Sequence, residues 1–145
     1  MKLTAQIEYA YWALLDIAER YNPDTTVNLN EISQRNGIPE KYLLQVMLKL
    51  KKQGIVRSRR GSGGGFQLSR APELIHLEEI VRILGGSQQE INSAFKSTGK
   101  KNGQAKCAFF DIWKAGQLAF FKELKQYNLK TLLLKEKRLR SRREA

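Results

Sequence analysis

The sequence predicts a mainly α-helical fold with one small β-hairpin, and three observations carry this prediction. Apolar residues recur every three or four positions in several segments, as in amphipathic helices. Segments 28–37 and 39–54 are typical of two helices joined by a tight turn. Segment 56–70 follows at once as two short strands around a glycine-rich, basic tip. We therefore expect a winged helix-turn-helix domain and, after it, a long C-terminal helix.

Four regions follow from the same patterns. We expect a winged helix-turn-helix domain over 1–86 and a flexible loop over 87–106, where Ser, Gln, Lys, Gly and Asn dominate. A helix is expected over 107–131 and a basic tail over 132–145. The tail is expected to fray and to add nonspecific attraction to a polyanion.

Charge limits the class of partner. The 145 residues carry a formal net charge of +12, which indicates a polyanion such as nucleic acid or an anionic membrane. Membrane is the weaker option, because no run approaches the roughly 18 apolar residues that span a bilayer. The N-terminus continues into a helix rather than an apolar signal segment, and there is one cysteine. A cytoplasmic protein is expected.

The first three helices have recognisable starts and ends. Thr4 is a possible N-cap for a helix over 4–21. Asn28 and Glu31 have the spacing of a capping box, and this short helix ends near Gly37. Pro39 opens the next helix and Gly54 closes it. Its predicted buried stripe is Leu43, Val46, Met47 and Leu50.

The other face of that helix is polar and basic, and carries Lys41, Tyr42, Gln45, Lys49 and Lys52. Such a face belongs either to a recognition helix or to an ordinary solvated surface. The basic hairpin directly after it favours recognition, since the two together are typical of a winged helix. The hairpin segment contributes Arg57, Arg59, Arg60 and Arg70.

Two further helices complete the expected fold. Segment 74–84 has a helical stripe that ends at Gly85-Gly86 and is expected to pack under the wing. The long helix carries an aromatic stripe of Phe109, Ile112, Trp113, Gly116, Phe120, Leu124 and Tyr127. A second copy of this helix is the simplest cover, with Gly116 as a point of close approach. The alternative, compatible with the first, is packing on residues 4–21.

At this point the residues resemble a known family, the IscR, NsrR and CymR-type winged-helix transcription regulators of bacteria. The resemblance rests on Met1-Lys2-Leu3-Thr4 with Tyr9-Ala10, Leu29-Asn30-Glu31-Ile32-Ser33 with Gly37-Ile38, Tyr42-Leu43-Leu44-Gln45, and above all Arg59-Arg60-Gly61-Ser62-Gly63-Gly64-Gly65-Phe66-Gln67-Leu68. It covers residues 1 to about 130. It implies a homodimer, held by the long helix, on a pseudo-palindromic operator.

The resemblance also implies which residues meet DNA. The family's base-contacting positions fall on Pro39, Lys41, Tyr42 and Gln45, and its minor-groove arginine falls on Arg60 beside Gly61. Pro39 departs from the small hydroxyl residue often found there, which suggests a different sequence preference. Leu44 either touches a thymine methyl or packs inward beside Leu48, and packing is the favoured prediction.

The family's sensor members bind an iron-sulfur cluster through three cysteines and a fourth ligand. This chain has only Cys107, at the last of the three positions, and Phe110 stands where one member uses histidine. Glu8 falls where some members supply a carboxylate, so a cluster on Cys107 and Glu8 is the alternative to the favoured prediction of no cofactor. Cys107 is otherwise a small helix-start residue or a redox-sensitive thiol. His76 is interpreted as a helix-entry residue.

The predicted function is a sequence-specific transcriptional regulator, binding double-stranded DNA as a homodimer through residues 109–127. We expect a repressor, responsive to a redox signal or a metabolite. The alternative is an RNA-binding or ribosome-associated protein, although Phe66 is the only aromatic residue near the wing. An enzyme is not expected, because the sequence has no Walker motif, no nucleophile elbow and no clustered His, Cys and carboxylate set.

Overall fold

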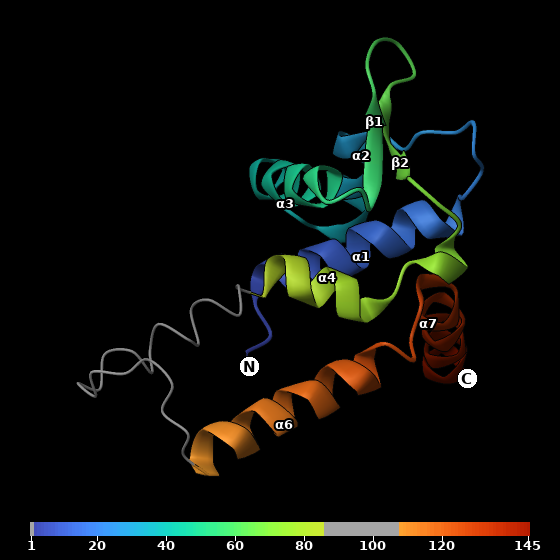
Figure 1. Cartoon of the computed structure of the whole chain (residues 1–145). Helices are drawn as coiled ribbons and strands as arrows, with labels where there is room; N and C mark the ends of the chain where they lie inside the picture. The colour runs from blue at the N-terminus through green and yellow to red at the C-terminus, as the bar shows by residue number, and fades with distance from the viewer. Residues whose placement is uncertain (1, 86–107) are drawn as a thin grey trace.

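A computed structural model describes residues 2–85 and 108–145 (Figure 1). The helices are α1 (Ala5–Glu19), α2 (Leu29–Asn36), α3 (Glu40–Lys52), the short 3-10 helix η1 (Pro72–Leu74), α4 (Leu77–Leu84), α6 (Ala108–Leu124) and α7 (Leu129–Glu144). Strands β1 (Val56–Arg59) and β2 (Gly65–Leu68) form one antiparallel hairpin. The mainly α-helical fold with a small hairpin is therefore confirmed.

Helix α1 lies at the centre of the core. Its buried residues include Ala10, Ala13 and Leu14, none of which is exposed to solvent, and α1 packs against α2, α3, α4 and α7. The predicted stripe of α3 is buried as well, with Leu43 and Met47 fully covered. Burying one such side chain stabilises the fold by roughly 1.5–3 kcal/mol. The outward face of α3 is thus fixed by what its inward face buries.

The helix-turn-helix has the predicted local signals. The side chain of Asn28 accepts a hydrogen bond from the backbone N–H of Asn30 at 2.8 Å and caps α2. Gly37 ends α2 with φ of 63°, a left-handed conformation that glycine adopts without strain. Asn36 and Arg35 of the last turn of α2 both donate hydrogen bonds to Asp16 of α1.

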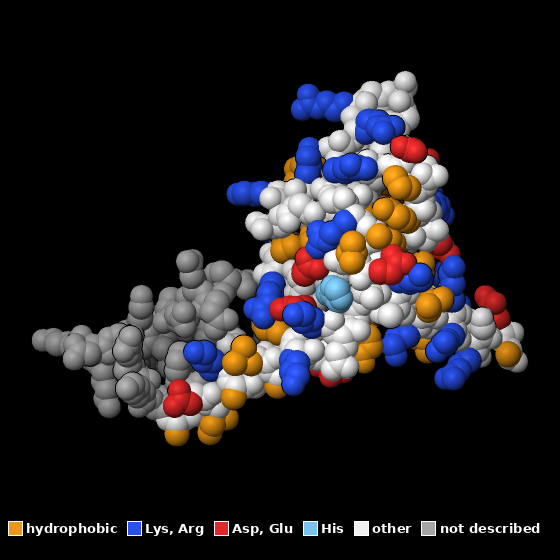
Figure 2. Space-filling model, turned by 45° about the vertical axis from the view of Figure 1, so that its right-hand side comes forward, with side chains coloured by type: hydrophobic (Ala, Val, Ile, Leu, Met, Phe, Trp, Pro, Cys, Tyr) orange, Lys and Arg blue, Asp and Glu red, His pale blue; other side chains and the backbone are white. Residues whose placement is uncertain are grey.

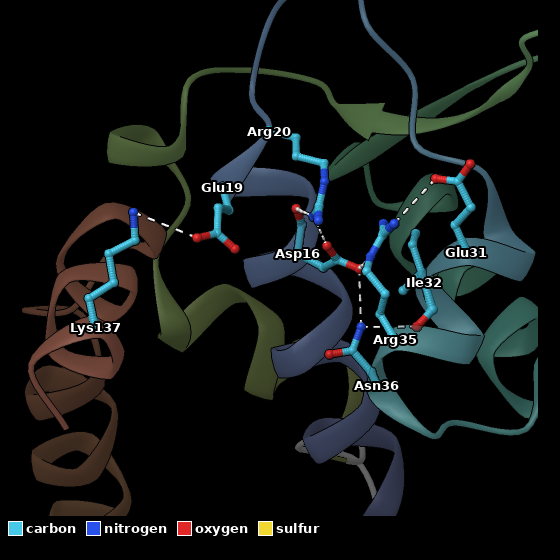
Figure 3. A network of polar contacts seen from close by, with 8 residues as sticks. All are labelled: Asp16, Glu19, Arg20, Glu31, Ile32, Arg35, Asn36 and Lys137. Atoms are coloured by element: carbon cyan, nitrogen blue, oxygen red, sulfur yellow. Dashed lines mark hydrogen bonds and ion pairs between the residues drawn. The ribbon is translucent and has the colours of Figure 1, made fainter. Parts of the chain in front are cut away.

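A buried carboxylate fixes the helix-turn-helix to α1 (Figure 3). Asp16 is 8% exposed, and it accepts hydrogen bonds from Arg35 Nε at 3.0 Å and from Asn36 Nδ2 at 3.1 Å. It also forms an ion pair with Arg20, one turn further along α1. The hydrogen bond to Asp16 raises the pKa of the Arg35 guanidinium. Sequence analysis missed this network, because its members are remote in sequence and each is common on helix surfaces.

The hairpin is attached to the chain before α2. Its register pairs Val56 with Leu68 and Arg59 with Gly65. Val27 forms a β-bridge with Phe66, and each backbone N–H of this pair donates to the carbonyl of the other at 2.8 Å. The base of the wing therefore consists of three hydrogen-bonded segments, β1, β2 and the chain at Val27, rather than of the two strands alone.

The C-terminal region differs from the prediction. The helix expected over 107–131 ends at Leu124, and α7 starts after Asn128, whose side chain forms a capping box with Thr131. Leu129 is fully buried and Leu132 is 8% exposed, because α7 packs on α1 and η1. The segment 132–145, expected as a basic tail, is part of α7 and is helical through Glu144; fraying of its end stays a prediction. Its packing on α1 makes α7, rather than α6, the C-terminal helix that covers residues 4–21.

The expected loop over 87–106 and Cys107 lie outside the described residues. Among the residues that are described, no helix has the length and apolar character to cross a membrane.

Candidate nucleic-acid interface

Helix α3 presents a polar face to solvent. Lys41, Tyr42 and Gln45 are all exposed, with Tyr42 at 56%. Pro39 is the N-cap residue of α3 and makes no side-chain capping bond, so this end of the helix is bordered by an exposed proline ring. The side chain of Glu40 instead accepts a hydrogen bond from Asn30 of α2 at 2.9 Å. The first two turns of α3 therefore have the access that base contacts need.

Two leucines share this exposed surface. Leu44 is 41% exposed and Leu48 is 50% exposed. The prediction that Leu44 packs inward beside Leu48 is therefore wrong, since the buried stripe of α3 is already complete without them. The remaining reading, contact with a thymine methyl in the major groove, stays a prediction.

Lys49 lies one turn further along the same helix. Its ammonium group donates a hydrogen bond to the side-chain oxygen of Gln6 on α1 at 2.7 Å. The partner is neutral and both side chains are exposed, so the positive charge of Lys49 is held in place without being neutralised. A cleft of about 260 Å³ between α1 and α3 is lined by Gln6, Tyr9, Tyr42 and Gln45 among others. Sequence analysis did not predict this involvement of α1.

The wing tip carries one unengaged arginine. Arg60 is exposed, and within 2–85 and 108–145 no hydrogen bond or ion pair to it is found. Gly61 beside it has φ of 95°, and a Cβ atom there would meet no neighbour. The tip is anchored from one side only, where the hydroxyl of Thr26 donates to the carbonyl of Gly63 at 2.6 Å.

Two other wing arginines are held by the loop before α2. Arg57 Nη2 donates to the carbonyl of Pro23 at 3.2 Å, and Arg59 Nη1 approaches the carbonyl of Asp24 at 3.5 Å. The buried amide of Gln67 lies against Arg57, and with its oxygen toward the guanidinium it accepts from Nη2 at 3.1 Å. These partners are neutral, so Arg57 and Arg59 remain positively charged, and both are exposed on the wing. Figure 2 shows Lys and Arg side chains spread over the surface of the molecule.

Arg70 has a different role from the other arginines of this segment. It donates to the carbonyls of Leu74 at 3.0 Å and Gly54 at 3.2 Å, and it forms an ion pair with Glu79 of α4. Arg70 therefore fastens the base of the hairpin to α4 and does not add to the free charge of the wing. Phe66 is 7% exposed, so the aromatic ring nearest the wing offers no platform for stacking a base.

The residues named for a cofactor do not assemble a metal site in the described part of the chain. Glu8 is exposed on α1, and Cys107 and the Phe110 side chain are not described. No group of three or more metal-ligating side chains occurs in 2–85 and 108–145. Iron-sulfur clusters are held by several thiolates, and one cysteine per chain does not match that donor set. His76 is the N-cap of α4, as expected of a helix-entry residue.

A helix-turn-helix with an accessible, basic second helix, followed at once by a positively charged hairpin, defines the winged-helix class of DNA-binding proteins. The sequence profile of the Rrf2 family, described as iron-dependent transcriptional regulators, matches residues 3–135. The chain belongs to the Rrf2 family of transcriptional regulators.

Individual relatives agree with this assignment. An rrf2-like regulator of Rhodobacter capsulatus is 36% identical over 58% of this chain and 57% of its own length. IscR of Aliivibrio salmonicida is 36% identical over 79% of this chain and 66% of its own length. NsrR of Bacillus licheniformis is 29% identical over 97% of both. The relatives are named as transcriptional regulators, a class of proteins that are not enzymes.

Solved structures share the fold. IscR of T. potens superposes with a TM-score of 0.73 and 26% identity, over 94% of this chain and 88% of that one. CymR of B. subtilis, titled the global cysteine regulator, superposes with a TM-score of 0.70 and 25% identity, over 92% of this chain and 96% of that one. The predicted resemblance to the IscR, NsrR and CymR-type regulators is therefore confirmed.

Proposed function

We propose that this chain is a cytoplasmic repressor that binds a pseudo-palindromic operator as a homodimer. The observation that carries the proposal is the exposure of Lys41 and Gln45 on α3 and of Arg60 on the wing, whose strand β1 packs against α3. On this proposal α3 reads the major groove while the wing lies on the backbone or in the adjoining minor groove. Residues 1–86 would carry DNA binding, and residues 109–127 would carry the dimer contact.

The side chains divide into two roles. Pro39, Lys41, Tyr42 and Gln45 border the start of α3 and are proposed to meet base edges. Gln45 suits adenine, because its amide can donate and accept at the same base edge. The second group is proposed to meet the sugar-phosphate backbone or the minor groove, and consists of Lys49, Arg57, Arg59, Arg60 and Gly61.

DNA binding in this form needs no bound cluster, and the one cysteine of the chain does not supply the several thiolates that hold an iron-sulfur cluster. An RNA-binding function is the weaker candidate, since the buried Phe66 leaves the wing without an exposed aromatic ring.

Selection from a random-sequence duplex library tests the proposal. The expected result is enrichment of an inverted repeat, bound more tightly than random duplex by roughly three decades or more. If six to ten phosphates are contacted per dimer, raising salt from 50 to 200 mM should weaken binding by about three to five decades. Failure to enrich any sequence, together with structured RNA that duplex DNA does not displace, would favour the RNA-binding alternative.

Single substitutions separate the two roles. Gln45→Ala should reduce the discrimination between operator and random duplex, by about 1–3 kcal/mol at the affected position. Lys49→Ala should instead weaken both duplexes alike and lower the salt slope by about one. Lys130→Ala is a matched control, because Lys130 lies on α7, outside the proposed interface. Its Nζ forms an ion pair with Glu73 Oε1 of η1 at 2.7 Å. Equal loss for operator and random duplex in Gln45→Ala would contradict base readout by Gln45.

A further inference from the structure

A polar cavity of about 270 Å³ lies where α1, the last turn of α2 and α7 meet. Its charged lining residues include four cations, Arg20, Arg35, Lys137 and Arg140. They also include three carboxylates, Asp16, Glu19 and Glu136. The cavity is much larger than one water molecule needs, and it is smaller than the clefts of about 300–1,000 Å³ that hold drug-sized ligands. Its size and its lining therefore suit a small charged molecule.

Two arginines of this cavity already bind a carboxylate. Arg20 and Arg35 both pair with the buried Asp16 (Figure 3). A guanidinium group has five N–H donors, and these two groups use only part of them. In the described part of the chain, the hydrogen bonds of Arg20 use Nη1, and those of Arg35 use Nε and Nη1. Both Nη2 groups are therefore able to donate to a second oxyanion.

Arg140 adds a positive charge that no acid of the cavity neutralises. The neighbouring charged groups are engaged, since Lys137 pairs with Glu19 at 3.7 Å and Glu136 accepts a hydrogen bond from the hydroxyl of Tyr11. Arg140 itself is exposed, and among residues 2–85 and 108–145 no hydrogen bond or ion pair to it is found. The lining residues of α7 recur every three or four positions and include Arg140, so they share the helix face that is turned toward α1.

We propose that this cavity binds a small metabolite through an oxyanion group, either phosphate or carboxylate, and that binding lowers the affinity for the operator. Arg140 and the Nη2 groups of Arg20 and Arg35 hold the oxyanion, because planar guanidinium groups match the geometry of phosphate and carboxylate. The effect on operator affinity rests on the proposed function, whereas binding of the anion does not.

Arg35 couples this site to the helix-turn-helix. Arg35 and Asn36 end α2, and the chain turns at Gly37 toward α3. An oxyanion that binds Arg35 competes with Asp16, the residue that fixes α2 to α1. The anion and the operator should therefore weaken each other's binding by the same factor, as thermodynamic linkage requires.

Fluorescence of Trp12 tests the site without DNA, because Trp12 is one of the lining residues. The chain has two tryptophans, so Trp113→Phe leaves Trp12 as the only one. Titration of this variant with inorganic phosphate or with succinate, at constant ionic strength, is expected to change the fluorescence until the site is saturated. Saturation by phosphate alone would assign a phosphate group, by succinate alone a carboxylate, and by both the shared chemistry. No saturation by either anion, or an equal response to chloride, would overturn the site.

Substitutions on α7 locate the bound anion. In the Trp113→Phe background, Arg140→Ala should weaken anion binding by about tenfold, since a charge-assisted hydrogen bond is lost. Arg138→Ala is the matched control, because it removes the same charge from the same helix, about 200° around the axis from Arg140. Both side chains are exposed, so neither substitution removes a buried contact. Equal anion affinities in the two variants would overturn the site.

Operator binding measured with and without the anion tests the regulation. At constant ionic strength, a saturating anion should lower operator affinity by about fivefold or more in the wild type and in Arg138→Ala. The same anion concentration should have a much smaller effect in Arg140→Ala. An equal effect in all three proteins would mean direct competition with DNA at the proposed interface, and would overturn the regulation.

The outcomes separate this inference from the proposed function. An operator affinity that is unchanged or raised when the anion binds would overturn the regulation and leave both the anion site and the repressor proposal standing. A chain that selects no operator, yet binds the anion through Arg140, would refute the proposed function and leave the anion site standing.

Discussion

Asp16→Ala should destabilise the protein more than any exposed charge substitution on the same helix. Losing one partner of a fully buried pair costs about 3–5 kcal/mol. The side chains of Arg20 and Arg35 are 42% and 35% exposed, so water can replace part of what they lose. Asn36 also keeps its bond to the carbonyl of Ile32 at 2.9 Å. We therefore expect a loss of about 2–3 kcal/mol, or roughly 6–12 °C in melting temperature.

Thermal unfolding followed by circular dichroism measures this loss, and Glu19→Ala is the matched control. Glu19 is an acid on the same helix whose ion pair with Lys137 spans 3.7 Å at the surface, so its removal should cost less than about 1 kcal/mol. A functional effect should accompany the structural one. Arg35 and Asn36 lie in the last turn of α2, directly before the turn that leads into α3, so operator affinity should fall even where the variant is fully folded. Equal melting temperatures for Asp16→Ala and Glu19→Ala would refute the reasoning.

Two other predictions follow from the backbone and from pH. Gly65→Ala should lower the free energy of unfolding by roughly 2–4 kcal/mol, because φ is 156° there and a Cβ would collide with the Val27 carbonyl. Urea unfolding measures this loss. A loss no larger than that of Gly61→Ala, where a Cβ would meet no neighbour, would contradict the prediction. Burial, with a hydrogen bond to Glu136, raises the pKa of Tyr11 above its ordinary value near 10. Above pH 10 the unfolded chain therefore loses this proton first, and stability should decrease in the wild type but less steeply in Tyr11→Phe, as urea titrations at pH 9–11 would show.

Local signals explain why the helix-turn-helix could be predicted from sequence. Asn28 and Gly37 act within their own turns, so their roles depend little on the rest of the fold. The buried stripe of α3 follows from its period for the same reason. The hairpin was predictable because glycines and basic residues mark its tip.

Features that depend on distant partners were not predictable in the same way. The charge of segment 132–145 gave no sign that it continues a docked helix. Leu, Lys, Glu and Arg are all good helix formers, and packing of Leu129 and Leu132 on the rest of the fold supplies the apolar contact. The Asp16 network joins residues up to 20 positions apart. The prediction that Leu44 packs inward was wrong, because the helical period gives the direction of the buried stripe but not its width.

The four arginines of the hairpin segment are not all free to meet DNA. Arg70 is neutralised by Glu79 and contributes to the fold alone. Arg57 and Arg59 donate to neutral carbonyls, so they keep their charge and attract DNA at long range while also holding the wing to the loop before α2. Arg60 alone of the four has neither task within the described residues. Arg57 and Arg59 thus supply positive charge at fixed positions, which sets the rate and salt dependence of association with DNA. Arg60 is free to change its conformation and is therefore suited to entering a groove.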